Sequence, residues 1–498
     1  MRGGFGHRIR SGDEEDFSLK QLNKELLRFL YTYFRPHLKK LFLAVGSMLM
    51  VTLATLAGPY LSKVAIDDYI IRGNLTGLNW IFVLMVISYL IFWLFSYFQT
   101  YLSRWIGQMI VGQIREDLYH HLQSLSLDFY NKRNTGDIMS RVTHDVTALS
   151  DLVSTGFVHL LNDFFTLAGI VIIMIYLDLR LALVTFITFP FIFFAVRFLG
   201  KRMRDAYKGV REKLAELNAD VEENLSGIRL VQALNREAQN TGKFSRLSWE
   251  NLKVNLKAVS YFSLLFPVMT LSRVFGEALV LVYGGWGIIN GIISLGVVMA
   301  FMGYVRRFFA PLADLSQVYN TYQSAGAALE RIYEYMSEEP TIKESAQPII
   351  IKESELQGNL EFAGVTFAYN KEPVIKNLNL KIESGENFAL VGPTGAGKTT
   401  IVRLLTRFYD VTGGEILLDG IDIRRLPIKQ LRKQIAVVPQ QIFLFDKSIK
   451  ENIAYGRPEA SEEEIVQVAK EVQAHNFIKD LPQGYQTRVG EGGVKLSG

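Results

Sequence analysis

Nine consecutive residues, GPTGAGKTT at 392–400, have the composition of a loop that binds phosphate groups. The pattern G-x-x-x-x-G-K-[ST] is satisfied by Gly392, Gly397, Lys398 and Thr399. Glycines let backbone N–H groups approach phosphate oxygens, and a helix that follows adds the positive end of its dipole. The lysine reaches the β- and γ-phosphates, and the threonine hydroxyl binds Mg²⁺. The stretch therefore predicts a site for a nucleotide phosphate chain and Mg²⁺.

The segments on either side of this loop support the prediction. ENFALVG at 386–392 is typical of a buried strand, and TTIVRLLTRFY at 399–409 is typical of a helix. A chance glycine-rich turn would not be expected in this strand–loop–helix context with the lysine and threonine also present. The predicted nucleotide-binding residues in the loop are Gly392, Pro393, Thr394, Gly395, Ala396, Gly397, Lys398, Thr399 and Thr400.

Two further residues are weaker candidates for the same site. Tyr369 precedes the loop in a strand-like stretch and could stack on an adenine ring, although a strand tyrosine more often serves packing. Gln440 ends the strand-like segment IAVVPQ and could contact Mg²⁺ or an attacking water. Taken alone, neither residue selects one class of P-loop protein.

The elements that position this site belong to a chain of two unlike halves. The sequence has 498 residues, of which 49% are hydrophobic, and a formal net charge of +5. Long apolar runs extend to about residue 310, and ordinary polar patterning begins near residue 335. Basic residues flank the apolar runs instead of clustering on a soluble face, so nucleic acid is not an expected partner. The absence of cysteine excludes disulfides and thiolate metal sites.

Six apolar runs are long enough to cross a lipid bilayer as helices. They lie at about 41–65, 79–103, 156–177, 180–199, 261–288 and 292–310. The long connections at about 104–155 and 200–260 are rich in charge, and basic residues remain on the cytoplasmic side. We therefore expect a multi-pass protein of the cytoplasmic (inner) membrane with both termini in the cytoplasm.

The expected domains are an N-terminal segment with an interfacial helix (1–36), a membrane domain (37–335), a linker (336–357) and a nucleotide-binding domain (358–498). Apolar residues of SLKQLNKELLRFLYTYF, 18–34, share one helical face. An ordinary soluble amphipathic helix is the alternative. Ionisable residues inside the spans, Asp163, Arg273 and Glu277, either line a substrate path or pair between helices, and the sequence leaves both interpretations open.

Five segments together give the chain a family resemblance. FAY, GPTGAGKTT, VVPQQIFLF, TRVGEGG and LSG occur in this order, and FYNKRNTGDIMSRVTHDV and NADVEENLSGIRLVQAL lie in the two long connections. With these motifs the chain resembles a half-transporter of the ATP-binding cassette exporter family, of the bacterial multidrug or lipid exporter type. The resemblance covers essentially the whole chain. It departs from the family pattern at Arg488, where the family usually has Glu, and at Gly492, where it has Arg.

The resemblance implies a fold, an activity and partners. The fold is a six-span α-helical membrane domain with long cytoplasmic extensions, followed by an incomplete α/β P-loop domain. Two short coupling helices are expected near 118–125 and 223–228. The activity is ATP-driven export of drug-like amphipathic molecules by a dimer of identical or different subunits. A lipid flippase or peptide exporter is the alternative within the family, and a non-pumping ATP-gated channel is the rival outside it.

The resemblance also assigns roles to individual residues. Tyr369 stacks on adenine, the loop 392–400 wraps the phosphates, and Gln440 links Mg²⁺ to the membrane domain. Ser497 and Gly498 belong to LSG, the start of the LSGGQ signature that holds the γ-phosphate of ATP on the other subunit. We therefore expect a sequence truncated inside the signature, without the family's catalytic Asp, Glu and switch His. Residues 1–498 alone are expected to show no steady-state ATPase, and Mg-ATP turnover that Lys398→Ala abolishes would refute this.

Overall fold

A computed structural model describes residues 24–370, 372–440 and 442–490. The chain divides into two compact units, Met1–Thr341 and Ile342–Gly498, which are treated separately.

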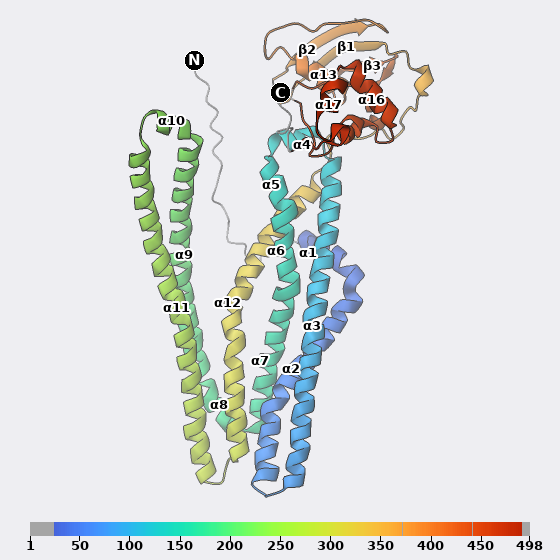
Figure 1. Cartoon of the computed structure of the whole chain (residues 1–498). Coiled ribbons are helices and arrows are strands. Elements are labelled where there is room, and N and C mark those ends of the chain that lie inside the picture. Colours follow the sequence, from blue (N-terminus) through green and yellow to red (C-terminus); the bar gives the residue numbers. More distant parts are fainter. Residues whose placement is uncertain (1–23, 371, 441, 491–498) are drawn as a thin grey trace. The chain divides into compact units, whose positions relative to one another are not determined.

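The described residues of the first unit form helices and the short connections between them (Figure 1). Its elements are α1 (Lys24–Phe34), η2 (Arg35–His37), α2 (Leu38–Val64), η3 (Ala65–Ile70), α3 (Leu75–Ser124), α4 (Leu127–Lys132), α5 (Thr135–Ser140), η4 (Arg141–Asp145), α6 (Val146–Asp151), η5 (Leu152–Gly156), α7 (Phe157–Leu177), α8 (Leu179–Phe186), α9 (Thr188–Ser226), α10 (Ile228–Ala233), α11 (Glu237–Ile289) and α12 (Leu295–Ser337).

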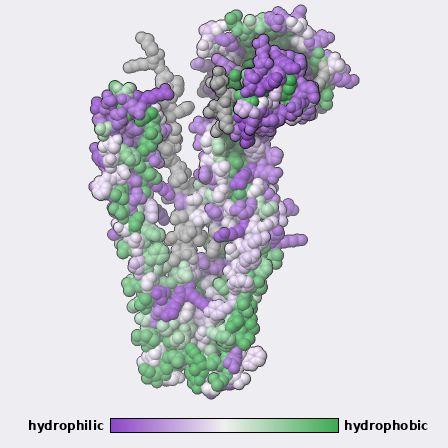
Figure 2. All heavy atoms as spheres, viewed as in Figure 1, coloured by the Kyte–Doolittle hydropathy of each residue, from purple (hydrophilic) through white to green (hydrophobic). Residues whose placement is uncertain are grey.

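Five described helical runs are long and apolar enough to cross a membrane, and they match the first five predicted spans. They cover Glu25–Ile70, Leu75–Ser124, Leu160–Leu177, Leu179–Ser226 and Glu237–Ile289. The sixth predicted span coincides with the first part of α12. Hydrophobic residues concentrate on the parts of the long helices farthest from α10, and hydrophilic residues cover the α10 end (Figure 2). This distribution is the one that a bilayer requires.

The ends of two spans are joined by a carboxylate clamp. Asp67 in η3 accepts hydrogen bonds from Ser294 Oγ at 2.6 Å and from the Gly296 backbone N–H at 2.8 Å. Gly296 allows this approach, since a Cβ there would lie 2.6 Å from the Asp67 carboxyl carbon. The clamp therefore satisfies an N–H group in the first turn of α12 with a side chain from the other helix.

The ionisable residues of the fifth span pair within the bundle. Glu277 Oε1 lies 2.6 Å from Arg273 Nη1 and 3.0 Å from Arg306 Nε on α12. Of the two interpretations of Arg273 and Glu277, the structure supports interhelical pairing. Asp163 on α7 instead lines a cavity, as described below.

The first long connection, α4–α6, is fastened to the end of α12. Asp145, 7% exposed, accepts two hydrogen bonds from Arg331, one from Nη2 at 2.7 Å and one from Nε at 3.0 Å. Arg133, just after α4, pairs with Glu334 at 2.9 Å and lies over the ring of Tyr335. These contacts hold α4–α6 against α12.

The two segments in which short coupling helices were expected do not form separate helices at those bounds. The first expected segment, 118–125, is the end of the continuous helix α3 and its cap, with Leu118 and Leu122 buried in the core. The separate short helix is α4, which starts at Leu127. The second segment, 223–228, spans the junction of α9 and α10 at Gly227. The apolar periodicity of 118–125 indicated a helix but did not show where that helix ends.

The second unit contains a small antiparallel sheet and short helices. The strands are β1 (Leu360–Phe367), β2 (Ile375–Ile382), β3 (Gly413–Leu418) and β4 (Ile421–Asp422), in the order β2-β1-β3-β4. The helices are η6 (Glu353–Glu355), α13 (Lys398–Leu405), η7 (Ile423–Arg425), α14 (Ile428–Lys433), α15 (Ile449–Ile453), η8 (Ala454–Gly456), α16 (Glu462–Glu471), α17 (His475–Asp480) and η9 (Gly484–Gln486). Phe362, 1% exposed, is the central core residue of β1 and faces Leu380 and Ile416 in the register.

The two strands predicted beside the nucleotide site are absent from this sheet. Residues 386–392 and the described part of 435–445 have no strand hydrogen bonding. Val391 is 93% exposed and Val438 is 95% exposed, which shows that neither segment is covered within the described residues. An extended segment becomes a strand only when a neighbour pairs with its backbone, and neither segment is paired here.

Candidate nucleotide-binding site

The phosphate loop has the backbone conformation that its glycines were expected to supply. Gly395 and Gly397 both have φ near +90°, and Gly397 caps α13 in the left-handed region. An L-residue with a Cβ is strained in that conformation. The helix predicted at 399–409 is present as α13, which starts one residue earlier, at Lys398, and ends earlier, at Leu405.

Lys398 lies over its own loop. Its Nζ donates to the carbonyl oxygens of Gly392 at 2.6 Å and Pro393 at 2.9 Å. Thr399 is exposed in the first turn of α13, beside exposed backbone at 392–396. The ammonium, the free loop surface and the hydroxyl thus lie together, which fits a phosphate chain.

Tyr369 lies beside the phosphate loop, against the side of α13. Its Oη donates to Thr400 Oγ1 at 3.2 Å, and its ring packs edge-on against Phe367 and Tyr409. Thr400 is 6% exposed, so this member of the predicted set supports the helix from beneath and its side chain is not at the loop surface. Tyr369 is 36% exposed, so part of its side chain remains accessible.

The remaining predicted site residues are not brought to the loop by this structure. Gln440 is exposed on a bend, and its side chain has no hydrogen-bond partner within the described chain. Ser497 and Gly498 lie outside the described residues. Among the described residues, no cluster of three or more His, Asp or Glu side chains could hold a metal. Magnesium prefers oxygen ligands, and the exposed Thr399 hydroxyl is one that this loop can supply beside phosphate and water.

The comparisons with known proteins match both halves of the chain. The ABC transporter transmembrane region matches residues 41–312, and the ABC transporter domain matches residues 375–498. An ATP-dependent lipid A-core flippase of Syntrophus aciditrophicus is 36% identical over 474 residues, which cover 95% of this chain and 78% of the relative. The chain belongs to the ABC transporter family. It is therefore a multi-pass membrane ATPase whose ATP turnover drives transport.

Two further comparisons place it among the exporters of this family. A putative multidrug export ATP-binding/permease protein of Bacillus subtilis is 34% identical over 475 residues, covering 94% of this chain and 81% of the relative. The structure of a bacterial Atm1-family ABC exporter with ATP bound superposes with a TM-score of 0.72 at 25% identity, covering 92% of this chain and 81% of the other. The exporter half-transporter fold implies that two subunits assemble.

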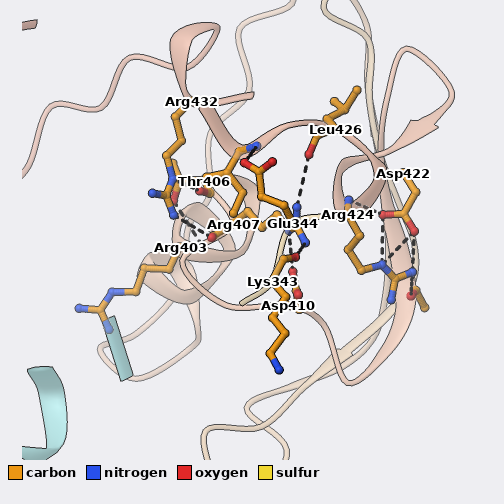
Figure 3. A network of polar contacts seen from close by, with 12 residues as sticks. Lys343, Glu344, Arg403, Thr406, Arg407, Asp410, Asp422, Arg424, Leu426 and Arg432 are labelled. Atoms are coloured by element: carbon orange, nitrogen blue, oxygen red, sulfur yellow. Dashed lines mark hydrogen bonds and ion pairs between the residues drawn. The ribbon is translucent and has the colours of Figure 1, made fainter. Parts of the chain in front are cut away.

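The transporter's P-loop helix is anchored at its far end by a buried arginine (Figure 3). Arg407 is 2% exposed and has φ of 51°, directly after α13. Its Nη2 donates to the Lys343 carbonyl at 2.9 Å, its Nη1 to the Leu426 carbonyl at 3.4 Å, and its Nε to Asp410 Oδ1 at 2.9 Å. Arg407 therefore joins three separate segments of the second unit.

A second arginine completes this anchor. Arg432 on α14 donates to the carbonyl oxygens of Thr406 at 3.1 Å and Arg407 at 3.0 Å. These are carbonyls at the C-terminal end of α13, which have no partner inside the helix. The sequence analysis did not single out either arginine, because nothing in a sequence shows which arginines are buried.

An aspartate ties the start of the sheet to the turn after β3. Asp419 accepts hydrogen bonds from the backbone N–H groups of Gln357 and Asn359 at 2.8 Å and of Gly358 at 3.1 Å. Burial alone would raise the pKa of the Asp419 carboxyl, but these N–H groups hold its pKa below the ordinary value. The carboxylate is thus the form that the fold stabilises.

A cavity of about 400 Å³ lies among the spans of the first unit. It is lined from α2, α3, α7 and α12 by both apolar and polar side chains. Val51, Phe92 and Val158 are among the apolar residues, and Asn162 and Asp163 are among the polar ones. Such a mixed lining suits a molecule that has an apolar part and a polar part.

Proposed function

We propose that this transporter is one subunit of a dimeric exporter that moves drug-like amphipathic molecules out across the cytoplasmic membrane by alternating access. The observation that carries the proposal is the mixed apolar and polar cavity between α2, α3, α7 and α12. The Bacillus subtilis relative, named for multidrug export, supports a cargo of this kind. The proposed orientation has both termini and both long connections in the cytoplasm.

ATP and Mg²⁺ supply the driving reaction, the hydrolysis of a phosphoanhydride. Lys398 would hold the phosphate chain, and the Thr399 hydroxyl would hold the metal. The Tyr369 ring stacks on the base, and Gln440 joins the metal to the membrane unit. Ser497 and Gly498 serve the nucleotide bound to the partner subunit. The partner is either an identical chain or a related one.

Transport by the full-length dimer in proteoliposomes tests this function. We expect Mg-ATP to drive accumulation of a fluorescent amphiphile, and Lys398→Ala to abolish it while the protein still assembles. Ion conductance without ATP-dependent accumulation of any amphiphile would instead support a nucleotide-gated channel.

A lipid flippase is the second candidate, because the relative from Syntrophus aciditrophicus is named for flipping lipid A-core. ATP-dependent movement of a labelled phospholipid between leaflets, without movement of soluble amphiphiles, would favour it. The same Lys398→Ala variant is the control for both assays.

A further inference from the structure

The cavity in the membrane unit carries more positive than negative charge. Arg104 from α3 and Arg307 from α12 line it, together with one carboxylate, Asp163 from α7. Among the described residues, the Arg307 guanidinium has a buried nitrogen without a hydrogen-bond partner, whereas Arg104 is exposed at the predicted end of the second span. Unpaired charge is costly at membrane depth, so such groups usually serve a function there.

Arg307 is held in a defined place. Its Nη2 lies 3.2 Å from the position that a Cβ on Gly58 of α2 would take, so the guanidinium packs directly against that helix. Its Nη1 is buried and has no hydrogen-bond partner in the described residues. A buried donor without a partner is rare in folded proteins and indicates a missing acceptor.

Ser103 shows a second unsatisfied group in the same cavity. It is 4% exposed, and its Oγ also has no hydrogen-bond partner among the described residues. It directly precedes Arg104 in α3. The Ser103 hydroxyl and the two guanidinium groups therefore line one cavity, in which Asp163 is the single carboxylate among the described lining residues.

Arg306, the residue before Arg307 on α12, has a carboxylate partner. Arg306 faces α11, where its Nε lies 3.0 Å from Glu277 Oε1, a carboxylate also bound by Arg273. Arg306 thus has a carboxylate partner, whereas Nη1 of Arg307 has no hydrogen-bond partner among the described residues.

We propose that this cavity binds the anionic head group of an amphipathic cargo, a phosphate or a related oxyanion. This inference rests on the proposed function. Arginine presents a planar fork of donors that matches such oxyanions, and Val51, Phe92 and Val158 would contact the apolar part of the same molecule. Arg307 follows the start of α12 by twelve residues, or about 18 Å of helix. In a hydrocarbon core of about 30 Å, the head group would lie in the half nearer the long connections.

Binding to the chain in phosphatidylcholine nanodiscs tests the proposal without ATP turnover. The probes are pyrene-labelled amphiphiles with one chain length and either a phosphate, a maltoside or a trimethylammonium head group. We expect the phosphate probe to bind about tenfold more tightly than the maltoside probe, as charge-assisted hydrogen bonds predict. Arg307→Gln should remove most of this preference and leave maltoside binding unchanged, whereas Arg307→Lys should retain part of it.

Arg306→Gln is the matched control, because it removes the same charge from the adjacent residue. Equal affinities for the phosphate and maltoside probes in wild-type protein would overturn the proposal, as would equal losses from Arg306→Gln and Arg307→Gln. If ATP-driven transport of the maltoside probe persisted in that case, the proposed function would stand and only the head-group site would fail.

Two sources could supply the anion. Adding phosphatidylglycerol to the nanodiscs distinguishes them: competition with the phosphate probe identifies a membrane lipid as the cargo. Undiminished probe binding identifies a free anionic amphiphile. Either result supports the oxyanion site.

Discussion

Replacing Arg407 by methionine should loosen the support of the P-loop helix. Methionine preserves much of the apolar volume but removes all three hydrogen bonds that Arg407 donates. Two of the acceptors, the carbonyls of Lys343 and Leu426, then lose a partner at a site where the arginine is 2% exposed. Removing one partner from a buried charged network costs about 3–5 kcal/mol. We expect Arg407→Met to lower the local free energy of unfolding by about 3 kcal/mol. The value is at the lower end of the range because the hydrogen bond to Leu426 is long and Asp410 remains partly solvated.

Hydrogen exchange of the whole chain in nanodiscs measures this loss locally. At about 1.4 kcal/mol for each factor of ten, protection of the amides in peptides covering 343–351 and 402–409 should fall about 100-fold. Arg403→Met is the matched control, because Arg403 is on the same helix and donates only one bond, of 3.4 Å, to Tyr369. Its effect should be less than about fivefold. Equal protection in the two variants would refute the view that Arg407 joins these segments.

Three further outcomes are expected. Lys398→Ala should raise the dissociation constant of a fluorescent ATP analogue about 10- to 100-fold, because a charged donor to phosphate is lost, while Lys376→Ala on the exposed side of β2 should not. Gly296→Ala should destabilise the detergent-solubilised protein by about 1–3 kcal/mol in thermal unfolding, because its Cβ would overlap the carboxylate clamp, and Gly285→Ala, which faces open space, should not. Asp419→Asn should weaken exchange protection of the three amides that donate to this side chain at pH 7. Because folding lowers the pKa of Asp419, its stabilisation is fully present above the unfolded value of about 3.9 and is lost as the pH falls through the lower folded pKa. The difference between variant and wild type should therefore be constant above about pH 5 and shrink as the pH is lowered below about 3.9; a difference that does not shrink would contradict the assignment.

The phosphate loop could be predicted from the sequence because its conformation depends on neighbouring residues in the chain. The pattern around Lys398 fixes a left-handed Gly397 and a helix start, and both follow from steric rules that act on neighbouring residues. The segments around Val391 and Val438 were not predictable in the same way, because their apolar alternation indicates a strand but contains no information about a pairing neighbour. Arg407 was missed for a related reason, since its burial depends on a carbonyl 64 positions away in the chain.

The fastening of Asp145 to Arg331 and of Arg133 to Glu334 has a mechanical consequence. A bidentate ion pair resists twisting as well as separation, because two donor atoms must leave two acceptor atoms together. The C-terminal end of α12 and the connection α4–α6 should therefore move together as one rigid body. A rotation imposed on α12 near Ser337 would therefore be transmitted to α4 almost without bending between them. Flexing of the subunit must then occur in other elements.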